Sequence, residues 1–275
     1  MATAISSGET LYLDRPAGRI AFDVAGDGPL VLLVPGIGDL RSAYRFLVPE
    51  LVEAGYRVAA MDLRGHGDSD ATFDTYDDVA LGTDVVALVQ HLGGPAVVAG
   101  NSMGAGGATW AAAEAPDLIR GLILIGPFVR EVPIGRVAKV AFRLLLLRPW
   151  GRAAWKMYYA KSYPGRRPAD LADHITRIDG SLKRRDYWRA LVATSRTSHA
   201  PVEARLAEVG APSLVVMGER DPDFRDPEAE ARHIQERLGS EVVLVPEAGH
   251  YPQAEYPEIV TPAVLEFLNR VARHA

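Results

Sequence analysis

Residues 95–104 read Pro-Ala-Val-Val-Ala-Gly-Asn-Ser-Met-Gly, and this stretch decides the fold. Its first five residues form a short apolar run that predicts a buried strand, and the small residues after Gly104 predict a helix. Between them lies Gly-x-Ser-x-Gly, which suits a sharp strand-to-helix turn because the glycines prevent side-chain collisions. Such a turn projects the Ser102 hydroxyl above the carboxyl end of a sheet, beside the N–H groups that open the helix. Ser102 is therefore a candidate nucleophile.

An acid and a base follow two later strands. The apolar run 212–218 precedes Asp221 and Asp223, and the run 241–246 precedes His250. The chain order is serine, aspartate, histidine, with each group at the carboxyl end of a strand, where open parallel sheets build their sites. A serine hydroxyl needs an adjacent base to act as a nucleophile, and a neutral imidazole serves well near neutral pH. Either aspartate could orient that imidazole.

These features resemble the α/β-hydrolase superfamily, and the resemblance covers nearly all 275 residues. Two further landmarks match: Val-Pro-Gly-Ile-Gly at 34–38 and Asp-Leu-Arg-Gly-His-Gly-Asp-Ser at 62–69. The resemblance implies an α/β-hydrolase fold, with a mostly parallel sheet flanked by helices and a helical cap insertion. It also implies a catalytic triad of Ser102, His250 and Asp221, since Asp221 matches the family's spacing after Gly218.

The resemblance further implies an oxyanion hole formed by the backbone N–H groups of Ile37 and Met103. The family's usual His-Gly pair is Pro35-Gly36 in this chain. That departure changes the hydrogen bonds that steady the loop, but it leaves the backbone donors in place. Asp39 could cap the helix that opens near Arg41.

The remaining polar residues near these motifs have structural interpretations. His66 is the main alternative to His250 as the base, but it lies in the 62–69 landmark, which is usually structural in the resembled family. The other five histidines are expected to be packed or solvated. Gly249 is expected to let the loop of His250 pass close to the serine turn. A serine at the nucleophile position, rather than an aspartate, disfavours dehalogenase and epoxide hydrolase activity. Three acidic residues are expected to form a solvated helix start, where negative charge is favourable: Asp74, Asp77 and Asp78.

An antiparallel hairpin opens the chain, and strands then alternate with helices. Continuous apolar strands separated by helices indicate a parallel sheet covered on both faces. The expected strands are 11–14, 19–24, 30–34, 56–62, 95–99, 121–125, 212–218 and 241–246, and the expected helices are 43–54, 76–92, 104–115, 227–238 and 257–271.

The alternation breaks between residues 128 and 205, which read as several helices. We therefore expect a hydrolase core of residues 1–127 and 206–275 and a helical cap subdomain of residues 128–205. From residue 130 to 205 the sequence has 17 Lys and Arg against 6 Asp and Glu, and no acidic residue lies between 132 and 169. These cations could pair with the acidic core, receive anionic or amphiphilic substrates, or contact a lipid surface.

Within this cap, Trp155 and Tyr159 are expected to contact the substrate. Arg136, Lys139 and Arg143 fall at helical spacing with apolar neighbours, which predicts an amphipathic basic helix.

Composition narrows the class of protein. The chain has no cysteine, so disulfides and a thiol nucleophile are excluded, and its net charge of −5 argues against nucleic-acid binding. No apolar run reaches the length of a membrane span, and no export signal opens the sequence, so a cytoplasmic location is expected. No nucleotide-binding or metal-binding motif is present, and neither a cofactor nor a metal is expected. The expected partner is a small acyl substrate.

The sequence thus predicts a serine hydrolase that cleaves an ester or related acyl bond through an acyl-enzyme. The same triad also serves carbon–carbon, lactone or thioester cleavage and cofactor-free perhydrolysis. A hydrolase-like receptor or sensor and a biosynthetic lyase or cyclase are alternatives of other classes, because one scaffold hosts many functions.

Overall fold

The computed structural model describes residues 9–132 and 135–273, and its sheet confirms the predicted mostly parallel architecture. Eight strands follow the order β1-β2-β4-β3-β5-β6-β7-β8. The β1–β2 hairpin and the β2–β4 pair are antiparallel, and every other neighbouring pair is parallel. The strands are β1 Leu11–Arg15, β2 Gly18–Ala25, β3 Leu30–Val34, β4 Arg57–Met61, β5 Ala96–Asn101, β6 Ile119–Ile125, β7 Ser213–Gly218 and β8 Glu241–Val245.

Helices cover both faces of the sheet, so its central strands are apolar throughout. In β3, Leu30, Leu32 and Val34 pack on one face with α2 (Asp78–His91), α3 (Met103–Glu114) and α9 (Pro227–Leu238). The alternate residues Val31 and Leu33 pack on the other face with α1 (Leu47–Glu53) and α11 (Pro257–Arg273). Successive side chains of a strand point to opposite faces, which explains why a doubly covered strand reads as one continuous apolar run.

The helix expected at 43–54 is broken in two. A 3-10 turn, η1, spans Arg41–Tyr44, and α1 begins only at Leu47. Pro49 accounts for the break, because its ring would clash with the carbonyl four residues earlier and it has no N–H to donate. It is therefore accommodated in the first turn of α1.

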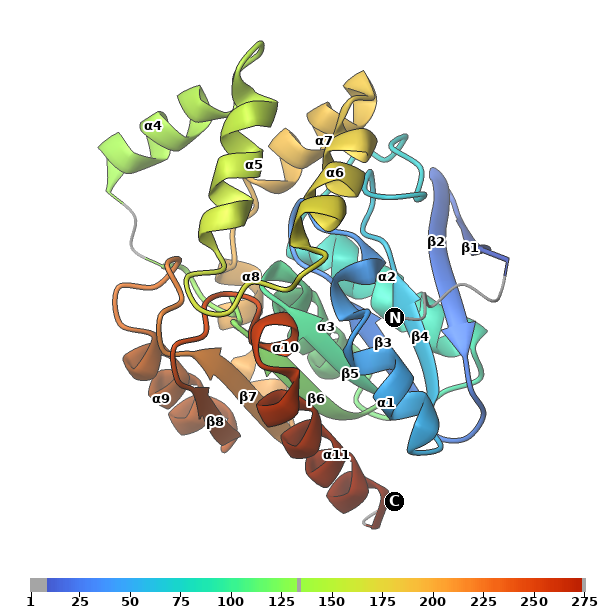
Figure 1. The fold of residues 1–275 in the computed structure, drawn as a ribbon. Coiled ribbons are helices and arrows are strands. Elements are labelled where there is room, and N and C mark those ends of the chain that lie inside the picture. Colours follow the sequence, from blue (N-terminus) through green and yellow to red (C-terminus); the bar gives the residue numbers. More distant parts are fainter. Residues whose placement is uncertain (1–8, 133–134, 274–275) are drawn as a thin grey trace.

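In the described part of the chain, five α-helices lie between β6 and β7, and Figure 1 shows α4 to α7 stacked above the sheet. Their aromatic and aliphatic side chains form a core of their own, which also includes Tyr251 from the loop after β8. The shorter α8 packs on α2 and α3 instead. We propose that residues 128–205, called the insertion below, form the cap. Its helices are α4 Arg136–Leu145, α5 Gly151–Lys161, α6 Leu171–Leu182, α7 Arg185–Thr194 and α8 Ala200–Glu203, and the remaining short elements of the chain are η2 Leu206–Glu208 and α10 Pro252–Glu255.

The basic helix predicted around Arg136, Lys139 and Arg143 corresponds to α4. The side chains of Arg136 and Lys139 lie outside the described residues, whereas that of Arg143 is exposed. Within the described ranges, no helix is long and apolar enough to cross a membrane.

Candidate active site

Ser102 occupies the predicted turn between β5 and α3. Its φ is 57° and its ψ is −124°, a backbone conformation that residues other than glycine rarely adopt. A Cβ on Gly100 would lie 2.3 Å from the carbonyl oxygen of Gly104, and one on Gly104 would lie 2.3 Å from that of Val34. The flanking glycines are therefore required by close backbone approach, as the motif predicts.

His250 lies beside Asp221 at the carboxyl ends of β7 and β8. Nδ1 of His250 is 2.7 Å from Oδ2 of Asp221, and both side chains are buried. Two backbone contacts fix the histidine loop: the Asn101 amide donates to the His250 carbonyl at 3.1 Å, and the His250 N–H donates to the Ser162 carbonyl at 3.0 Å. Asn101 therefore links the loop of the base to the turn of Ser102, a role that only the fold reveals.

A second carboxylate faces the same imidazole. Oδ2 of Asp223 lies 3.5 Å from Nδ1 of His250, while its Oδ1 accepts a 2.6 Å hydrogen bond from Tyr158. Burial would lower the pKa of His250, but the charges of Asp221 and Asp223 and the hydrogen bond to Asp221 raise it to about 9. Burial has the opposite effect on the acid and raises the pKa of Asp223.

The same three side chains form the one cluster in the described residues with a spacing that could hold a metal ion, since their ligand atoms lie within 4.8 Å of one another. The imidazole nitrogen nearest the carboxylates, Nδ1 of His250, already hydrogen-bonds Asp221. The geometry is thus that of a histidine oriented by an acid, and no metal is needed to explain it.

Ser102 and His250 line one cavity of about 110 Å³. The cavity lies between the turn that carries the serine and the insertion. Ligand cavities commonly measure about 300–1,000 Å³, so this one suits a small group. Its other lining residues are Ile37, Met103, Phe128, Phe142, Trp155, Tyr158, Ser195, His199, Asp223 and Tyr251.

The predicted oxyanion donors border this cavity. Ile37 and Met103 both line it, and neither backbone N–H donates to any group in the described part of the chain. A Cβ on Gly36 would lie 2.8 Å from Cβ of Ser102, so the loop that carries Ile37 runs against the nucleophile turn. Free N–H groups next to a serine can stabilise an oxyanion that forms there.

Asp39 has a different role from the expected helix cap. The N–H of Arg41, which opens η1, donates to Oδ1 of Asp62 at 2.7 Å. Asp39 accepts from the Leu40 N–H at 2.7 Å, and it also accepts hydrogen bonds from the Tyr159 hydroxyl at 2.8 Å and from Nε2 of His174 at 2.8 Å. The side chains of Asp39, Tyr159 and His174 are almost fully buried. The sequence predicts that Tyr159 and Trp155 both contact the substrate. The Tyr159 hydroxyl is instead hydrogen-bonded to Asp39, and Tyr159 is not among the residues that line the cavity, whereas Trp155 lines it.

Asp78 is not solvated, contrary to expectation. Its carboxylate is buried, and Oδ2 lies 2.6 Å from Nδ1 of His199. His199 lines the same cavity as Ser102, so the structure holds a second histidine–aspartate pair there. The aromatic ring of Phe128 separates the two histidines, 5.5 Å from the ring of His199 and 6.0 Å from that of His250. Asp77 does cap α2, accepting from the N–H of Ala80.

Gly249 is required by the insertion and not by the serine turn. A Cβ on Gly249 would lie 2.2 Å from Cδ of Pro164 and 2.3 Å from the Ser162 carbonyl oxygen. His66 is buried, with Nδ1 2.8 Å from the carbonyl oxygen of Arg64, and it does not line the cavity.

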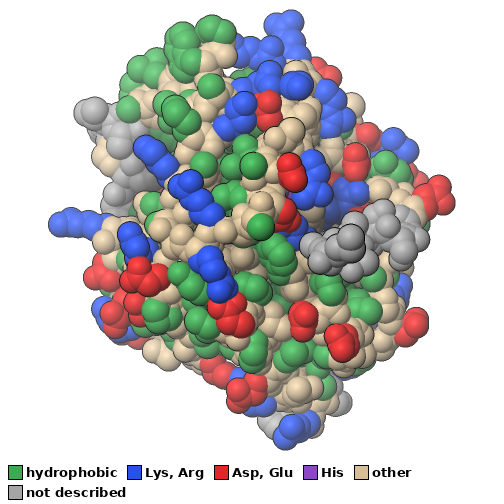
Figure 2. Space-filling view, in the orientation of Figure 1, with side chains coloured by type: hydrophobic (Ala, Val, Ile, Leu, Met, Phe, Trp, Pro, Cys, Tyr) green, Lys and Arg blue, Asp and Glu red, His purple; other side chains and the backbone are tan. Residues whose placement is uncertain are grey.

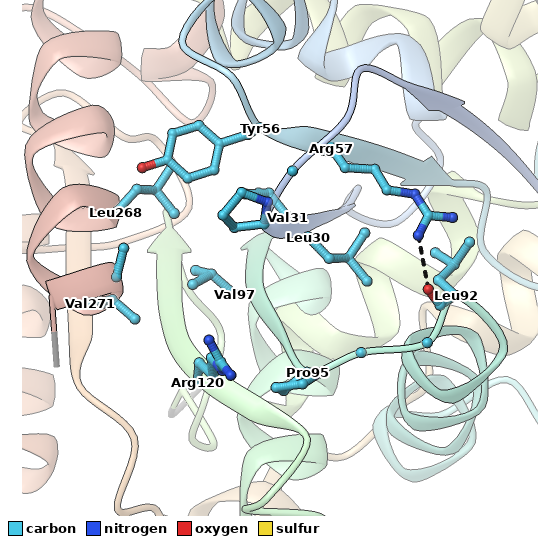
Figure 3. Close-up of a pocket in the computed structure, with 15 residues that line it drawn as sticks. Leu30, Val31, Tyr56, Arg57, Leu92, Pro95, Val97, Arg120, Leu268 and Val271 are labelled. Carbon is cyan, nitrogen blue, oxygen red and sulfur yellow. Dashed lines mark hydrogen bonds between the residues drawn. The ribbon is translucent and has the colours of Figure 1, made fainter. Parts of the chain in front are cut away.

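A larger cavity of about 330 Å³ lies at the opposite edge of the sheet, where β3, β4 and β5 begin (Figure 3). Arg57 closes one side of it by donating to the Leu92 carbonyl at 2.9 Å. None of the candidate catalytic groups lines it. Cavity size alone therefore does not mark the site.

With this geometry in view, comparison with known proteins identifies the family. Residues 31–263 match the family model described as the alpha/beta hydrolase family. The chain belongs to the alpha/beta hydrolase family. Its membership confirms both the resemblance drawn from the sequence motifs and the predicted fold class.

Several proteins similar to this alpha/beta hydrolase are hydrolases of different kinds. The 2-(acetamidomethylene)succinate hydrolase of Mesorhizobium japonicum is 29% identical over 280 residues, which cover 98% of this chain and 99% of the relative. A 2-hydroxy-6-oxononadienedioate/2-hydroxy-6-oxononatrienedioate hydrolase of Burkholderia vietnamiensis is 30% identical, with 92% and 91% covered. The structure of a thermophilic esterase from Thermogutta terrifontis aligns with a TM-score of 0.76 and 27% identity, covering 96% of this chain and 99% of that one.

Proposed function

We propose that this alpha/beta hydrolase is a serine hydrolase that cleaves an ester or related acyl bond of a small molecule. One observation carries the proposal: Ser102, strained at its turn, shares a cavity with His250, whose Nδ1 hydrogen-bonds the buried Asp221. A nucleophile, a base and an orienting acid in this arrangement are the elements of acyl transfer.

The proposed reaction has two stages. Ser102 Oγ attacks the substrate carbonyl while Nε2 of His250 takes its proton, and the N–H groups of Ile37 and Met103 stabilise the oxyanion. His250 then gives the proton to the leaving group as the bond to the carbonyl carbon breaks. Water, activated by the same imidazole, hydrolyses the acyl-enzyme and restores Ser102. Asp221 keeps the imidazole in the tautomer that this proton transfer needs.

The Trp155 side chain is the leading candidate for a substrate contact. It lines the cavity and packs on Gly38, one residue from Ile37, and a Cβ on Gly38 would lie 2.7 Å from its Nε1. That buried N–H finds no acceptor among the described residues. A buried donor without a partner is costly, so an acceptor atom of a bound substrate would stabilise this site.

The relatives widen the range of bonds to test. The substrates in the names of these two relatives are all dicarboxylates; that of the first carries an acetamido group and those of the second an oxo group. Amide and carbon–carbon cleavage therefore stand beside ester cleavage as reactions to test. Lactone and thioester cleavage and perhydrolysis use the same triad. We expect substrates that carry a carboxylate to be favoured over neutral ones of equal size.

Covalent labelling combined with turnover tests the proposal. A fluorophosphonate should add once to the wild-type protein, as measured by intact mass, and should not add to Ser102→Ala. Ser195→Ala is the matched control, because Ser195 lines the same cavity but its hydroxyl donates to the Val192 carbonyl. Ester turnover should fall in Ser102→Ala to the residual level that binding and the oxyanion hole supply. Labelling without turnover on esters, amides, lactones, thioesters or diketones would favour a receptor.

A further inference from the structure

Exposed apolar side chains concentrate on one part of the insertion. In the described part of the chain nine large hydrophobic side chains are exposed, and six of them fall between residues 140 and 157. These six are 40% to 62% exposed, and Figure 2 shows apolar side chains gathered at the top left, over α4 and the start of α5. We call this group the apolar face: Val140, Leu144, Leu145, Leu147, Trp150 and Met157.

The apolar face stays exposed although neighbouring side chains anchor this region to the rest of the insertion. Leu146 is buried, and the ring of Phe142 lies 6.4 Å from that of Tyr158. The indole of Trp150 is held in place, since its N–H donates a 3.0 Å hydrogen bond to the Leu144 carbonyl, yet 53% of the residue is exposed. A group of large apolar side chains that stays open to solvent marks an interaction site.

The segment that carries the apolar face is rich in positive charge. Residues 132–169 contain nine Lys and Arg and no Asp or Glu. Arg152 and Lys156 on α5 are paired with Asp179 on α6. The exposed cations of this segment that form no ion pair with any residue the structure describes include Arg143, Arg148 and Lys161.

We propose that the apolar face binds the surface of an anionic phospholipid bilayer. Trp150 has the amphipathic ring that suits the headgroup region, while Leu144 and Leu147 enter the acyl boundary beneath it. Arg143 and Arg148 pair with lipid phosphates while their aliphatic stems lie along the apolar surface. Phe142 lies on α4 and lines the cavity of Ser102. Binding to the bilayer through the apolar face would therefore place this cavity beside the membrane surface.

Charge favours a bilayer over a second copy of the chain. A two-fold dimer through the apolar face would set each cation-rich segment against its own copy, with no acidic residue from 132 to 169 to offset the repulsion. An anionic bilayer offers the complementary charge. Attraction between exposed charges is screened by salt, which gives the proposal a second signature.

Vesicle co-sedimentation tests the proposal without relying on turnover. The wild-type protein should sediment with phosphatidylcholine vesicles containing phosphatidylglycerol and far less with phosphatidylcholine alone. Leu144→Ser/Leu147→Ser should weaken that binding roughly tenfold or more, through loss of apolar burial. Arg143→Gln/Arg148→Gln should weaken it on the order of 30-fold at low salt and less at high salt. The matched control is Leu11→Ser/Ile259→Ser, which changes two exposed apolar residues outside the insertion.

Two results would overturn the proposal. One is wild-type protein that fails to sediment with either vesicle, or sediments as well after the Leu144/Leu147 change as after the Leu11/Ile259 change. The other is a dimer, seen by analytical ultracentrifugation, that this leucine change dissociates, which would assign the apolar face to a second copy. Binding is measured directly, so failure of the proposed hydrolase function would leave the vesicle result unaffected.

Discussion

The Tyr159 hydroxyl donates a 2.8 Å hydrogen bond to Oδ2 of Asp39, which joins α5 of the insertion to the loop that carries Ile37. Asp39 is fully buried, so its carboxylate depends on such donors. Both residues lie near the cavity in the sequence: Asp39 follows Gly38 directly, and Tyr159 lies four residues after Trp155. The insertion therefore helps to set the position of the oxyanion loop.

Tyr159→Phe removes this hydrogen bond while keeping the ring. We expect a loss of about 1–3 kcal/mol in the free energy of unfolding, measured in urea, because a buried carboxylate loses a donor. We also expect kcat to fall more than KM rises, since the loop that stabilises the oxyanion loses a support. Tyr56→Phe is the control, because its hydroxyl bonds Asn269 far from the site. Equal loss of kcat in both variants would contradict the positional role.

Asp221 and Asp223 can be separated by conservative substitution. Asp221→Asn should lower kcat on the order of 10⁴-fold, because the orienting acceptor 2.7 Å from Nδ1 of His250 is lost. Asp223→Asn should be mild, because its nearest carboxylate oxygen lies 3.5 Å from that nitrogen. Initial rates on one ester decide the matter, and the reverse order of effects would make Asp223 the orienting acid.

The pH profile should report the charges around His250. Only the neutral imidazole can take the serine proton, and the two carboxylates favour the charged form, so kcat/KM should rise with pH until about 9. Asp223→Asn removes one of these charges and should move the acidic limb to lower pH. An acidic limb that stays in place in this variant would show that Asp223 does not act on His250.

His199 should contribute to binding and not to the chemical step. Its Nδ1 is engaged by Asp78, and Nε2 has no hydrogen-bond partner among the described residues that line the cavity. Because Asp78 holds Nδ1 of His199, Nε2 is the ring nitrogen left to hydrogen-bond a polar group of the substrate, such as a carboxylate. His199→Asn should raise KM about tenfold for a carboxylate-bearing ester and little for a neutral ester of equal size. His91→Asn, at the end of α2, serves as the control.

Local sequence predicted the groups that follow strands. Ser102, Asp221 and His250 each end an apolar run, and the parallel sheet brings such ends together, as the 2.7 Å contact between His250 and Asp221 shows. Apolar runs and turn residues also predicted the bounds of most strands and helices. The exception is the helix expected at 43–54, because periodicity alone does not show that Pro49 splits it into η1 and α1.

The second layer of the site could not be predicted in this way. Asp39 meets Tyr159 across 120 residues of sequence, and Asp78 meets His199 across 121. No spacing or periodicity links such pairs, because they form only when the insertion folds over the core. Local sequence predicts that Asp78 lies at a solvated helix start, because acidic residues suit that position. In the fold it is buried and hydrogen-bonded to the distant His199.

Because the N–H of His250 donates to the carbonyl of Ser162, the position of the histidine loop in the core depends on the insertion. An insertion transplanted from another member of the family would have to present a carbonyl at this point and a hydroxyl above Asp39. Without them, the histidine loop would lose an anchor and a buried carboxylate would lose a donor. Chimaeras that exchange the insertion should therefore recover activity only when residues 39 and 249–250 are exchanged with it, so that substrate range and catalytic competence are inherited together.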